Sequence, residues 1–178
     1  MRFLIKELAM LFILFKNNNK CATIFMVILM KETVLCYLFK EDKCLMLYRN
    51  KKENDLNQGK YIGVGGKIED GETPEVALIR EVREETGYFL NGFTKRGEIL
   101  FQNDEYSEYM HLYTSNTFFG KEIKCDEGDL AWVAIDDILN LNLWEGDKVF
   151  LKMLLLDEPF FKIKLNYSND EFKGWDYI

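Results

Sequence analysis

Three glutamates that could hold a divalent cation lie close together in the sequence, at Glu81, Glu84 and Glu85. On a helix these positions are i, i+3 and i+4, so the three carboxylates share one face and repel one another. Hard cations such as Mg²⁺ and Mn²⁺ prefer oxygen ligands and bind through carboxylates together with substrate phosphates. The cluster therefore indicates a metal-dependent phosphate site. The alternative is an ordinary solvated acidic face, balanced by Arg80 and Arg83.

A helix is predicted around these glutamates. Thr73 is a good N-cap and Pro74 suits the first helical position, and strong helix formers follow. Gly87 suits the C-terminal side, so the helix should stop there. Leu78 and Val82 lie four residues apart and are expected to face the core, which leaves an exposed acidic cluster on the other side.

The regular spacing extends beyond these acids. Gly66, five residues, Glu72, seven residues and then the run from Arg80 to Gly87 match the pattern G-x5-E-x7-R-E-U-x-E-E-x-G, where U is aliphatic. The next position is usually aliphatic and here is Tyr88, whose apolar ring can still face the core. On this motif the chain resembles the Nudix hydrolase family. The resemblance implies an α+β fold, a mixed β-sheet sandwiched between helices in a single domain, and metal-dependent hydrolysis of a nucleoside diphosphate linked to another moiety.

The resemblance also implies a role for each matched residue. Glu81, Glu84 and Glu85 would bind Mg²⁺, with Mn²⁺ as the alternative, or activate water, and the Gly65 carbonyl would be a further ligand. Arg80 would orient the glutamates through charge-assisted hydrogen bonds. Glu81 and Glu85 both qualify as the general base, and the sequence does not choose between them.

Three further segments resemble one branch of this family, the MutT-type 8-oxo-dGTP diphosphatases: LMLYRNKKENDLNQGKYIGVGGKIEDGETP, DEGDLAWVAIDDI and LWEGDKVFLKMLLLDEPFF. In that branch an acid before the W-V strand completes the metal site, and here it is Glu127, with a plain loop acid as the alternative. Trp144 and Asp147 would form the base pocket, lined by Phe150, although Trp144 could also simply pack in the core. Asp147, if held protonated, could pair with the base edge. Lys67, beside the glycines, would help to hold the triphosphate.

Two departures from the branch bear on the base. Ile62, just after Tyr61, stands where the animal enzymes carry an asparagine, and Gly146 replaces the first of two paired aspartates. The implied activity is Mg²⁺-dependent hydrolysis of 8-oxo-dGTP or related oxidised purine nucleoside triphosphates to monophosphate and pyrophosphate, which sanitises the nucleotide pool. The alternatives are a dinucleoside polyphosphate hydrolase, for which Tyr106 is a weak signal, a nucleotide-sugar hydrolase, and a non-catalytic nucleotide-sensing module.

Composition narrows the classes of partner. The chain has 178 residues and a net charge of −7, with a pI of about 4.9. Such an acidic chain is a poor match for a nucleic-acid polymer, whereas a small nucleotide remains compatible because a metal can reverse the local field. The four cysteines show no zinc spacing, so we expect reduced thiols, as in a cytoplasmic protein. We further expect a monomer or a homodimer without a membrane partner. The single histidine, His111, is interpreted as a strand residue.

The elements expected around the motif define two parts of the chain. Residues 1–30 are interpreted as an N-terminal extension outside the folded domain, with a membrane-associated leader as the alternative, and residues 31–178 as the Nudix domain. The two apolar runs of the extension are interrupted by KNNNK and are too short to span a bilayer. In the domain, strands are predicted at 33–39, 44–50, 61–67, 97–102, 109–119, 130–135 and 160–167, with helical spacing at 144–156.

Overall fold

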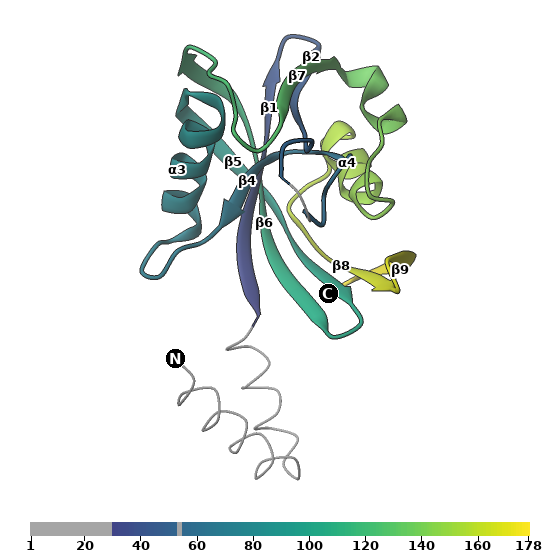
Figure 1. Cartoon of the computed structure of the whole chain (residues 1–178). Coiled ribbons are helices and arrows are strands. Elements are labelled where there is room, and N and C mark those ends of the chain that lie inside the picture. Colours follow the sequence, from purple (N-terminus) through teal and green to yellow (C-terminus); the bar gives the residue numbers. More distant parts are fainter. Residues whose placement is uncertain (1–29, 53–54) are drawn as a thin grey trace. The chain divides into compact units, whose positions relative to one another are not determined.

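The computed structural model describes residues 30–52 and 55–178. The chain divides into two compact units, Met1–Lys31 and Glu32–Ile178. The predicted extension, apart from its last residue, lies outside the described residues, as does Cys21. Figure 1 shows the second unit, in which the strands form one sheet and two helices pack against it.

The described residues form nine strands in a single sheet, with the order β3-β2-β1-β6-β5-β8-β9. The predicted first hairpin is present as β1, Lys31–Lys40, and β2, Lys43–Tyr48. Strand β2 also pairs with β3, Tyr61–Ile62, and with β7, Asp129–Ala134. Strand β4, Val64–Lys67, pairs with β1 and thereby anchors the glycines of the motif.

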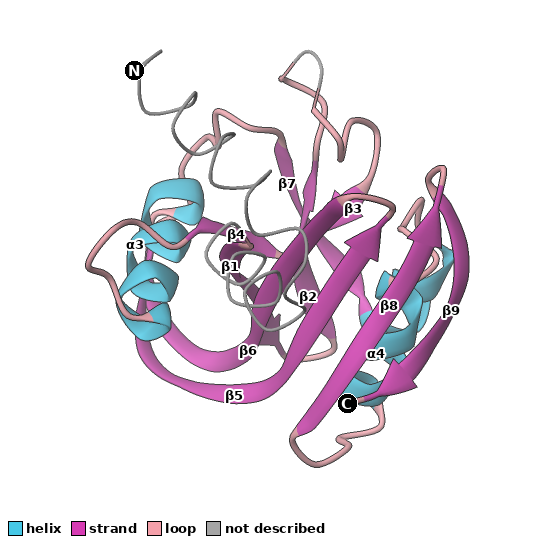
Figure 2. Cartoon of the chain, turned by 90° about the horizontal axis from the view of Figure 1, so that it is seen from below, coloured by secondary structure: helices cyan, strands magenta, loops and turns pink. Residues whose placement is uncertain are grey.

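The second half of the sheet is longer than predicted. Strands β5, Tyr88–Asn103, and β6, Tyr106–Gly120, form an antiparallel pair with three register shifts in its first half. Strand β8, Phe161–Ser168, runs parallel to β5, which makes the sheet mixed, and β9, Glu171–Tyr177, adds an edge strand that was not predicted. Figure 2 shows β5, β6 and β8 lying alongside one another.

Two helices cover the two faces of the sheet. Helix α3, Pro74–Thr86, packs Ala77, Leu78 and Val82 against one core. Helix α4, Asp147–Leu155, packs its apolar face against the other core, after the short 3-10 helix η1, Ile135–Asn140. Strand β1 sends alternate residues to the two cores, as a strand buried on both faces must. The predicted sheet between helices is confirmed.

Helix α3 begins and ends where the sequence indicates. The Thr73 side chain accepts a hydrogen bond from the Val76 backbone N–H at 3.3 Å, and Pro74 is the first helical residue. Gly87 has φ of 77° and donates its backbone N–H to the Arg83 carbonyl. A Cβ at Gly87 would lie 2.5 Å from the Lys121 carbonyl oxygen, so glycine is required at this turn.

Three smaller predictions concern single residues and the membrane. His111 is a buried residue of β6, as interpreted. Cys36, Cys44 and Cys125 are buried free thiols. Of the helices in the described part of the chain, none is both long enough and apolar enough to cross a membrane.

Candidate active site

Two glycines of β4 allow the acidic helix to approach the sheet. A Cβ at Gly66 would lie 2.4 Å from Oε1 of Glu81, and a Cβ at Gly65 would lie 2.0 Å from the Val34 carbonyl oxygen. The Gly65 N–H donates to Oε2 of Glu85 at 2.7 Å. A side chain at Gly66 would push Glu81 and its helix away from β4, whereas a side chain at Gly65 would collide with the backbone of β1, which explains the two glycines.

The three glutamates of the motif differ in exposure. Glu85 is 6% exposed, whereas the Glu81 side chain is 15% exposed and that of Glu84 is 62% exposed. The expectation of a uniformly exposed cluster is therefore wrong, because β4 and the segment before β7 cover the C-terminal turn of the helix. Only Glu84 extends freely into solvent.

Glu85 is held in an environment that disfavours its charge. Burial, assisted by the charges of Glu127 and Glu81, raises its pKa to about 8, against the opposing hydrogen bond from Gly65. The Oε1 atom of Glu85 is buried and has no hydrogen-bond partner. Burial also raises the pKa of Glu81, against the opposing effect of Arg80. A buried carboxylate oxygen without a partner is costly unless a cation or a proton satisfies it.

Arg80 binds the acids on the outer side of the helix. Its Nε and one terminal nitrogen form a bidentate pair with Glu72, both at 2.8 Å, and the other nitrogen reaches Glu81 at 2.8 Å and Glu84 at 3.3 Å. The Lys67 carbonyl also accepts from Arg80 at 3.1 Å. Hydrogen bonds from Arg80 lower the pKa of Glu72 to about 2. Arg80 thus ties the loop before the helix to the glutamates, as a fork-shaped guanidinium can.

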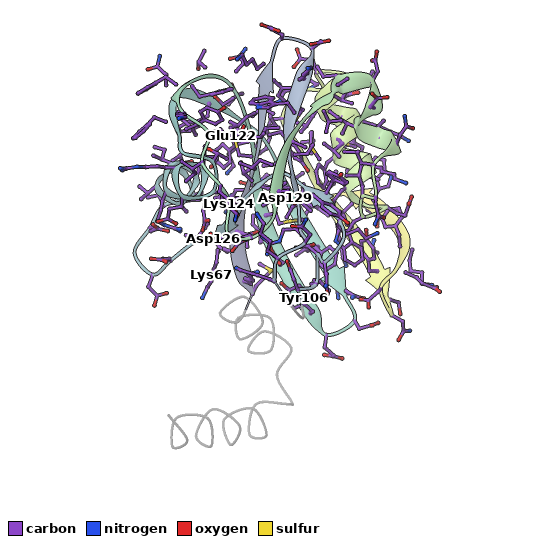
Figure 3. The ribbon with its side chains drawn as sticks, turned by 45° about the horizontal axis from the view of Figure 1, so that its top comes forward. Lys67, Tyr106, Glu122, Lys124, Asp126 and Asp129 are labelled. Atoms are coloured by element: carbon purple, nitrogen blue, oxygen red, sulfur yellow. The ribbon has the colours of Figure 1, made fainter. Side chains whose placement is uncertain are left out.

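Glu127 lies in the segment that leads into β7, where Figure 3 labels Lys124, Asp126 and Asp129. Arg49 and Lys52 each form a salt bridge with a different oxygen of Glu127. Burial opposes ionisation of Glu127, but the bond from Lys52 and the charge of Arg49 outweigh it and lower its pKa. Lys51 donates to the carbonyls of Cys125 and Gly128, at 2.8 and 2.7 Å. Side chains of the segment after β2 therefore hold the segment before β7 in place through salt bridges and hydrogen bonds.

The arrangement fits a cation, although it is not a preformed cage. Within residues 30–52 and 55–178, no three His, Cys, Asp or Glu side chains converge closely enough to hold a metal ion. Glu81, Glu85 and Glu127 nevertheless lie near one another. The charge of Glu127 raises the pKa of both Glu81 and Glu85, and the charge of Glu81 also raises the pKa of Glu85. Glu85 adds a buried, unpartnered oxygen to this set of hard oxygen donors, which is the donor chemistry that Mg²⁺ and Mn²⁺ require.

Trp144 lies on the other side of the sheet, against the core that α4 covers. Its ring N–H donates to Oδ1 of Asn57 at 2.8 Å, and its ring meets Tyr167 edge-on at 5.9 Å between centroids. The Lys60 ammonium lies over the ring, 5.2 Å from its centroid, and donates to Oδ1 of Asn142 at 3.0 Å. The indole is therefore fixed in one orientation and partly exposed, rather than enclosed in the core.

Asp147, the first residue of α4, is partly exposed, but protein surrounds its carboxyl group. Burial raises the pKa of Asp147 to about 7; Lys60 opposes the shift and Glu108 adds to it. Near neutral pH the group is therefore shared between its charged and protonated forms. A protonated carboxyl can donate a hydrogen bond, which a carboxylate cannot.

The remaining predicted substrate residues fall into different environments. Tyr61 lies on the Trp144 side and packs against Tyr48 at 4.7 Å between ring centroids, whereas Ile62 packs against the core on the α3 side. Phe150 is fully buried and presents no surface to a ligand in this conformation. Lys67 is exposed at the end of β4. The structure thus groups Tyr61 with Trp144 and separates Ile62 from it.

Arg49 connects the two sides of the site. Its backbone N–H donates to the Lys60 carbonyl at 2.9 Å, and its own carbonyl accepts from Gly59 at 2.7 Å. The Arg49 guanidinium forms a salt bridge with Glu127, and the ammonium group of Lys60, the backbone partner of Arg49, lies over the Trp144 ring. The sequence pattern singles out neither Arg49 nor Lys60, because a cation in a polar stretch usually lies in solvent. The adjacency of Lys60 to Tyr61 was the available signal.

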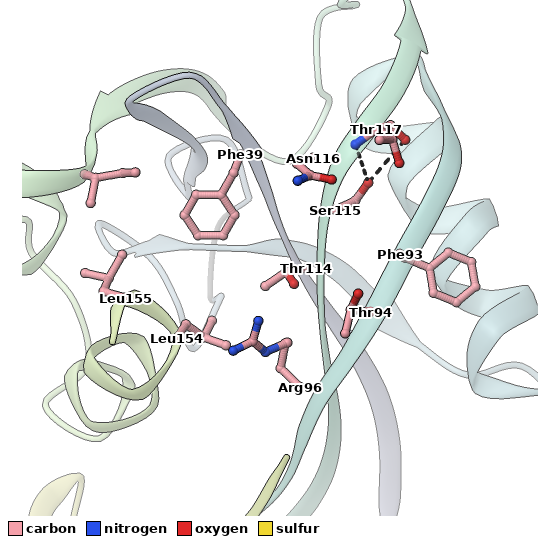
Figure 4. A pocket seen from close by; sticks show the side chains of 11 residues that line it. Phe39, Phe93, Thr94, Arg96, Thr114, Ser115, Asn116, Thr117, Leu154 and Leu155 are labelled. Atoms are coloured by element: carbon pink, nitrogen blue, oxygen red, sulfur yellow. Dashed lines mark hydrogen bonds between the residues drawn. The ribbon is translucent and has the colours of Figure 1, made fainter. Parts of the chain in front are cut away.

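A separate pocket of about 430 Å³ opens between the β5–β6 pair and α4. Figure 4 shows Phe39, Thr94, Arg96 and Asn116 around it. None of the predicted site residues lines this pocket, and Arg96 is engaged by Asp157 at 2.7 Å. It is therefore distinct from the acidic site.

Comparison with known proteins agrees with this geometry. Residues 30–154 match the model of the NUDIX domain. The zebrafish (Danio rerio) oxidized purine nucleoside triphosphate hydrolase is 32% identical over 129 residues, covering 71% of this chain and 79% of the relative. The mouse (Mus musculus) protein of that name is 30% identical over 111 residues, covering 61% and 71%.

Among solved structures, the MutT protein from Bacillus halodurans superposes with a TM-score of 0.75 at 24% identity, covering 83% of this chain and 97% of that one. This likeness shows the fold, and the match of the domain model over most of the chain shows the family. The chain is a member of the Nudix family of hydrolases, and its relatives include nucleoside triphosphate hydrolases.

Proposed function

We propose that this Nudix hydrolase uses a divalent cation to cleave purine nucleoside triphosphates to monophosphate and pyrophosphate, with 8-oxo-dGTP or a related oxidised purine as the preferred substrate. The observation that carries the metal-dependent chemistry is the buried Glu85 carboxylate, with one oxygen unpartnered beside Glu81 and Glu127. The oxidised-purine preference is supported by the names of relatives at about 30% identity. Such an enzyme would remove damaged nucleotides from the pool before DNA synthesis.

Glu81, Glu84, Glu85, Glu127 and the Gly65 carbonyl would hold Mg²⁺, or Mn²⁺ in its place. A cation bound there would neutralise phosphate charge and lower the pKa of an attacking water. Glu81 or Glu85 would accept the proton of that water, since both lie at the covered end of the cluster. Arg80 would keep Glu81 oriented through the contact described above.

The base would bind on the Trp144 side of the sheet. The fixed indole of Trp144 offers a stacking surface for a purine, with Tyr61 nearby in the same core cluster. Asp147 in its protonated form would donate a hydrogen bond to the base edge, which is compatible with its pKa of about 7. Ile62 faces the other side of the sheet, so base reading would depend on fewer polar groups than in the animal enzymes.

A nucleotide panel tests this proposal. With Mg²⁺ present, kcat/KM would be measured for 8-oxo-dGTP, dGTP, dATP, ADP-ribose and a diadenosine polyphosphate, by release of pyrophosphate or monophosphate. We expect 8-oxo-dGTP to give the highest value, with loss of turnover when Mg²⁺ is chelated. A flat profile or a preference for a dinucleotide would leave the hydrolase chemistry standing but overturn the substrate. Absence of turnover on every substrate would favour a sensing module.

A further inference from the structure

Arg49, which directly follows β2, is unusually buried for an arginine. It is only 8% exposed. Its Nε donates to Oδ2 of Asp55 at 2.6 Å, and one terminal nitrogen forms a salt bridge with Glu127. Its backbone is fixed by the two hydrogen bonds to Lys60 and Gly59. A buried, doubly paired guanidinium with a fixed backbone is positioned by the fold and does not behave as a surface charge.

The guanidinium supplies the positive charge next to the carboxylates proposed as metal ligands. Glu127 has both oxygens bound by cations, one by Arg49 and the other by Lys52. The charge of Arg49 is also felt at Glu85, which it stabilises in the ionised form. A carboxylate cannot offer the same lone pairs to an arginine and to a metal at full strength. Arg49 and a cation would therefore compete for the Glu127 carboxylate.

We propose that Arg49 is the internal counter-ion of Glu127 in the acidic site and competes with a divalent cation for this carboxylate, so that it is displaced from Glu127 when the cation binds. This role rests on the proposed metal-dependent function. Arg49 is a positioning residue in this scheme, since it acts through Glu127. Asp55 retains the guanidinium after displacement, because Nε contacts Asp55 independently of the nitrogen that binds Glu127.

In this scheme Arg49 and the metal ion compete for the Glu127 carboxylate. Removing the arginine leaves Glu127 free to turn to the cation, so a variant without this charge should bind metal more tightly. Lys52 contacts the same carboxylate but its side chain is 52% exposed. An exposed ammonium is weakly held and screened by solvent, so it competes less. Lys52→Met is therefore a matched control, with the same loss of charge at the same partner.

Calorimetric titration with Mn²⁺ at constant pH, without nucleotide, tests the inference. We expect Arg49→Met to bind Mn²⁺ about tenfold more tightly than wild type, the change that one charge-assisted hydrogen bond would produce. Lys52→Met should stay within about twofold of wild type, as expected for an exposed ion pair. In a Glu127→Gln background, Arg49→Met should no longer change the affinity. Unchanged or weaker Mn²⁺ binding by Arg49→Met would overturn the role of Arg49.

Thermal unfolding separates this role from simple structural support. Without metal, Arg49→Met should melt below wild type, and saturating Mn²⁺ should close most of the gap; a gap of equal size in both conditions would contradict the inference. If Arg49→Met does not fold, Arg49→Lys replaces it, since lysine keeps the charge but cannot hold both carboxylates, and a smaller tightening is expected. Failure of wild type to bind Mn²⁺ would refute the metal site itself. Intact wild-type binding that Arg49 does not influence would refute only the counter-ion.

Discussion

At the level of single residues, the two carboxylate oxygens of Glu85 lie in different environments, unlike those of an acid with a purely structural role. One oxygen accepts from the Gly65 N–H, and the other is buried without a partner. Glu85→Gln keeps the shape but removes the charge that would bind a cation. We expect kcat to fall by about 10²–10⁴-fold, the range for loss of a catalytic acid or base. The free energy of unfolding of the metal-free protein should not fall, because a carboxyl group whose ionisation burial disfavours is replaced by a neutral amide of the same shape.

The measurement is steady-state kinetics with the best nucleotide, alongside urea unfolding in a chelator. Glu105→Gln makes the same charge change in the exposed β5–β6 turn and should leave both quantities unaltered. A near-normal kcat in Glu85→Gln would remove Glu85 from the metal site.

Asp147 provides a residue-scale prediction of pH dependence. Its pKa in the folded protein is about 7, well above the ordinary value of 3.8. The folded state therefore binds the proton more tightly than the unfolded state does. The stability that this group contributes is fully present below about pH 4 and is lost as the pH rises through about 7.

Asp147→Asn should accordingly match wild type in unfolding free energy below about pH 4 and exceed it near pH 8. The difference at pH 8 should be on the order of 1–2 kcal/mol, discounted from the full shift because the residue is partly exposed. Asp137→Asn, at an exposed position of η1, is the control, and its stability relative to wild type should not change with pH in this way. Parallel stability curves for Asp147→Asn and wild type would disprove the raised pKa.

At the level of elements, the C-terminal end of α3 decides how this helix joins the sheet. Gly87 and Gly71 both have positive φ, at 77° and 87°, but only Gly87 is crowded, since a Cβ at Gly71 would meet nothing within 4 Å. Gly71→Ala should cost about 1–2 kcal/mol of unfolding free energy, the strain of a left-handed residue alone. Gly87→Ala should cost clearly more, because its Cβ would also strike the Lys121 carbonyl oxygen. Equal losses in chemical denaturation would show that the crowding at Gly87 is relieved without cost.

The elements also show what the sequence could and could not predict. Helix α3 was predicted with both ends, because its cap, its proline and its glycine are local signals that need no tertiary context. Strand β9 was missed because its charges and Gly174 give no alternating pattern, and it exists through pairing with β8. The first half of β5 was missed for a similar reason, since Gly92 and the register shifts interrupt its periodicity.

The site divides in the same way. The glutamates of α3 were predicted together because they share one helix, and local spacing is visible in sequence. The partners of Glu127 were not predicted, since Arg49 and Glu127 are 78 positions apart and meet only because β2 pairs with β7. The difference in burial between Glu84 and Glu85 likewise depends on β4, which is distant in sequence.

At the level of the whole molecule, net charge constrains how a substrate is held. A protein of charge −7 repels a nucleoside triphosphate at long range. In the acidic site described above, the resident cations Arg80, Arg49 and Lys52 are each engaged by carboxylates. Of the lysine and arginine side chains proposed around the site, the exposed Lys67 is then the one left to the phosphates, which gives the proposed divalent cation a large share of phosphate neutralisation.

The whole-molecule prediction concerns where the working domain begins. The NUDIX match starts at residue 30, and β1 starts at Lys31. The first residues of β1 have a specific task, because Thr33 to Cys36 pair with Lys67 to Val64 and so hold the two glycines against Glu81 and Glu85. We predict that a chain beginning at Met30 keeps the melting temperature and the kcat/KM of the full chain. A chain beginning at Tyr37, which lacks the β1–β4 pairing, should lose both. Differential scanning calorimetry and nucleotide turnover check the pair, and a loss of either property in the Met30 chain would show that residues before it support the domain.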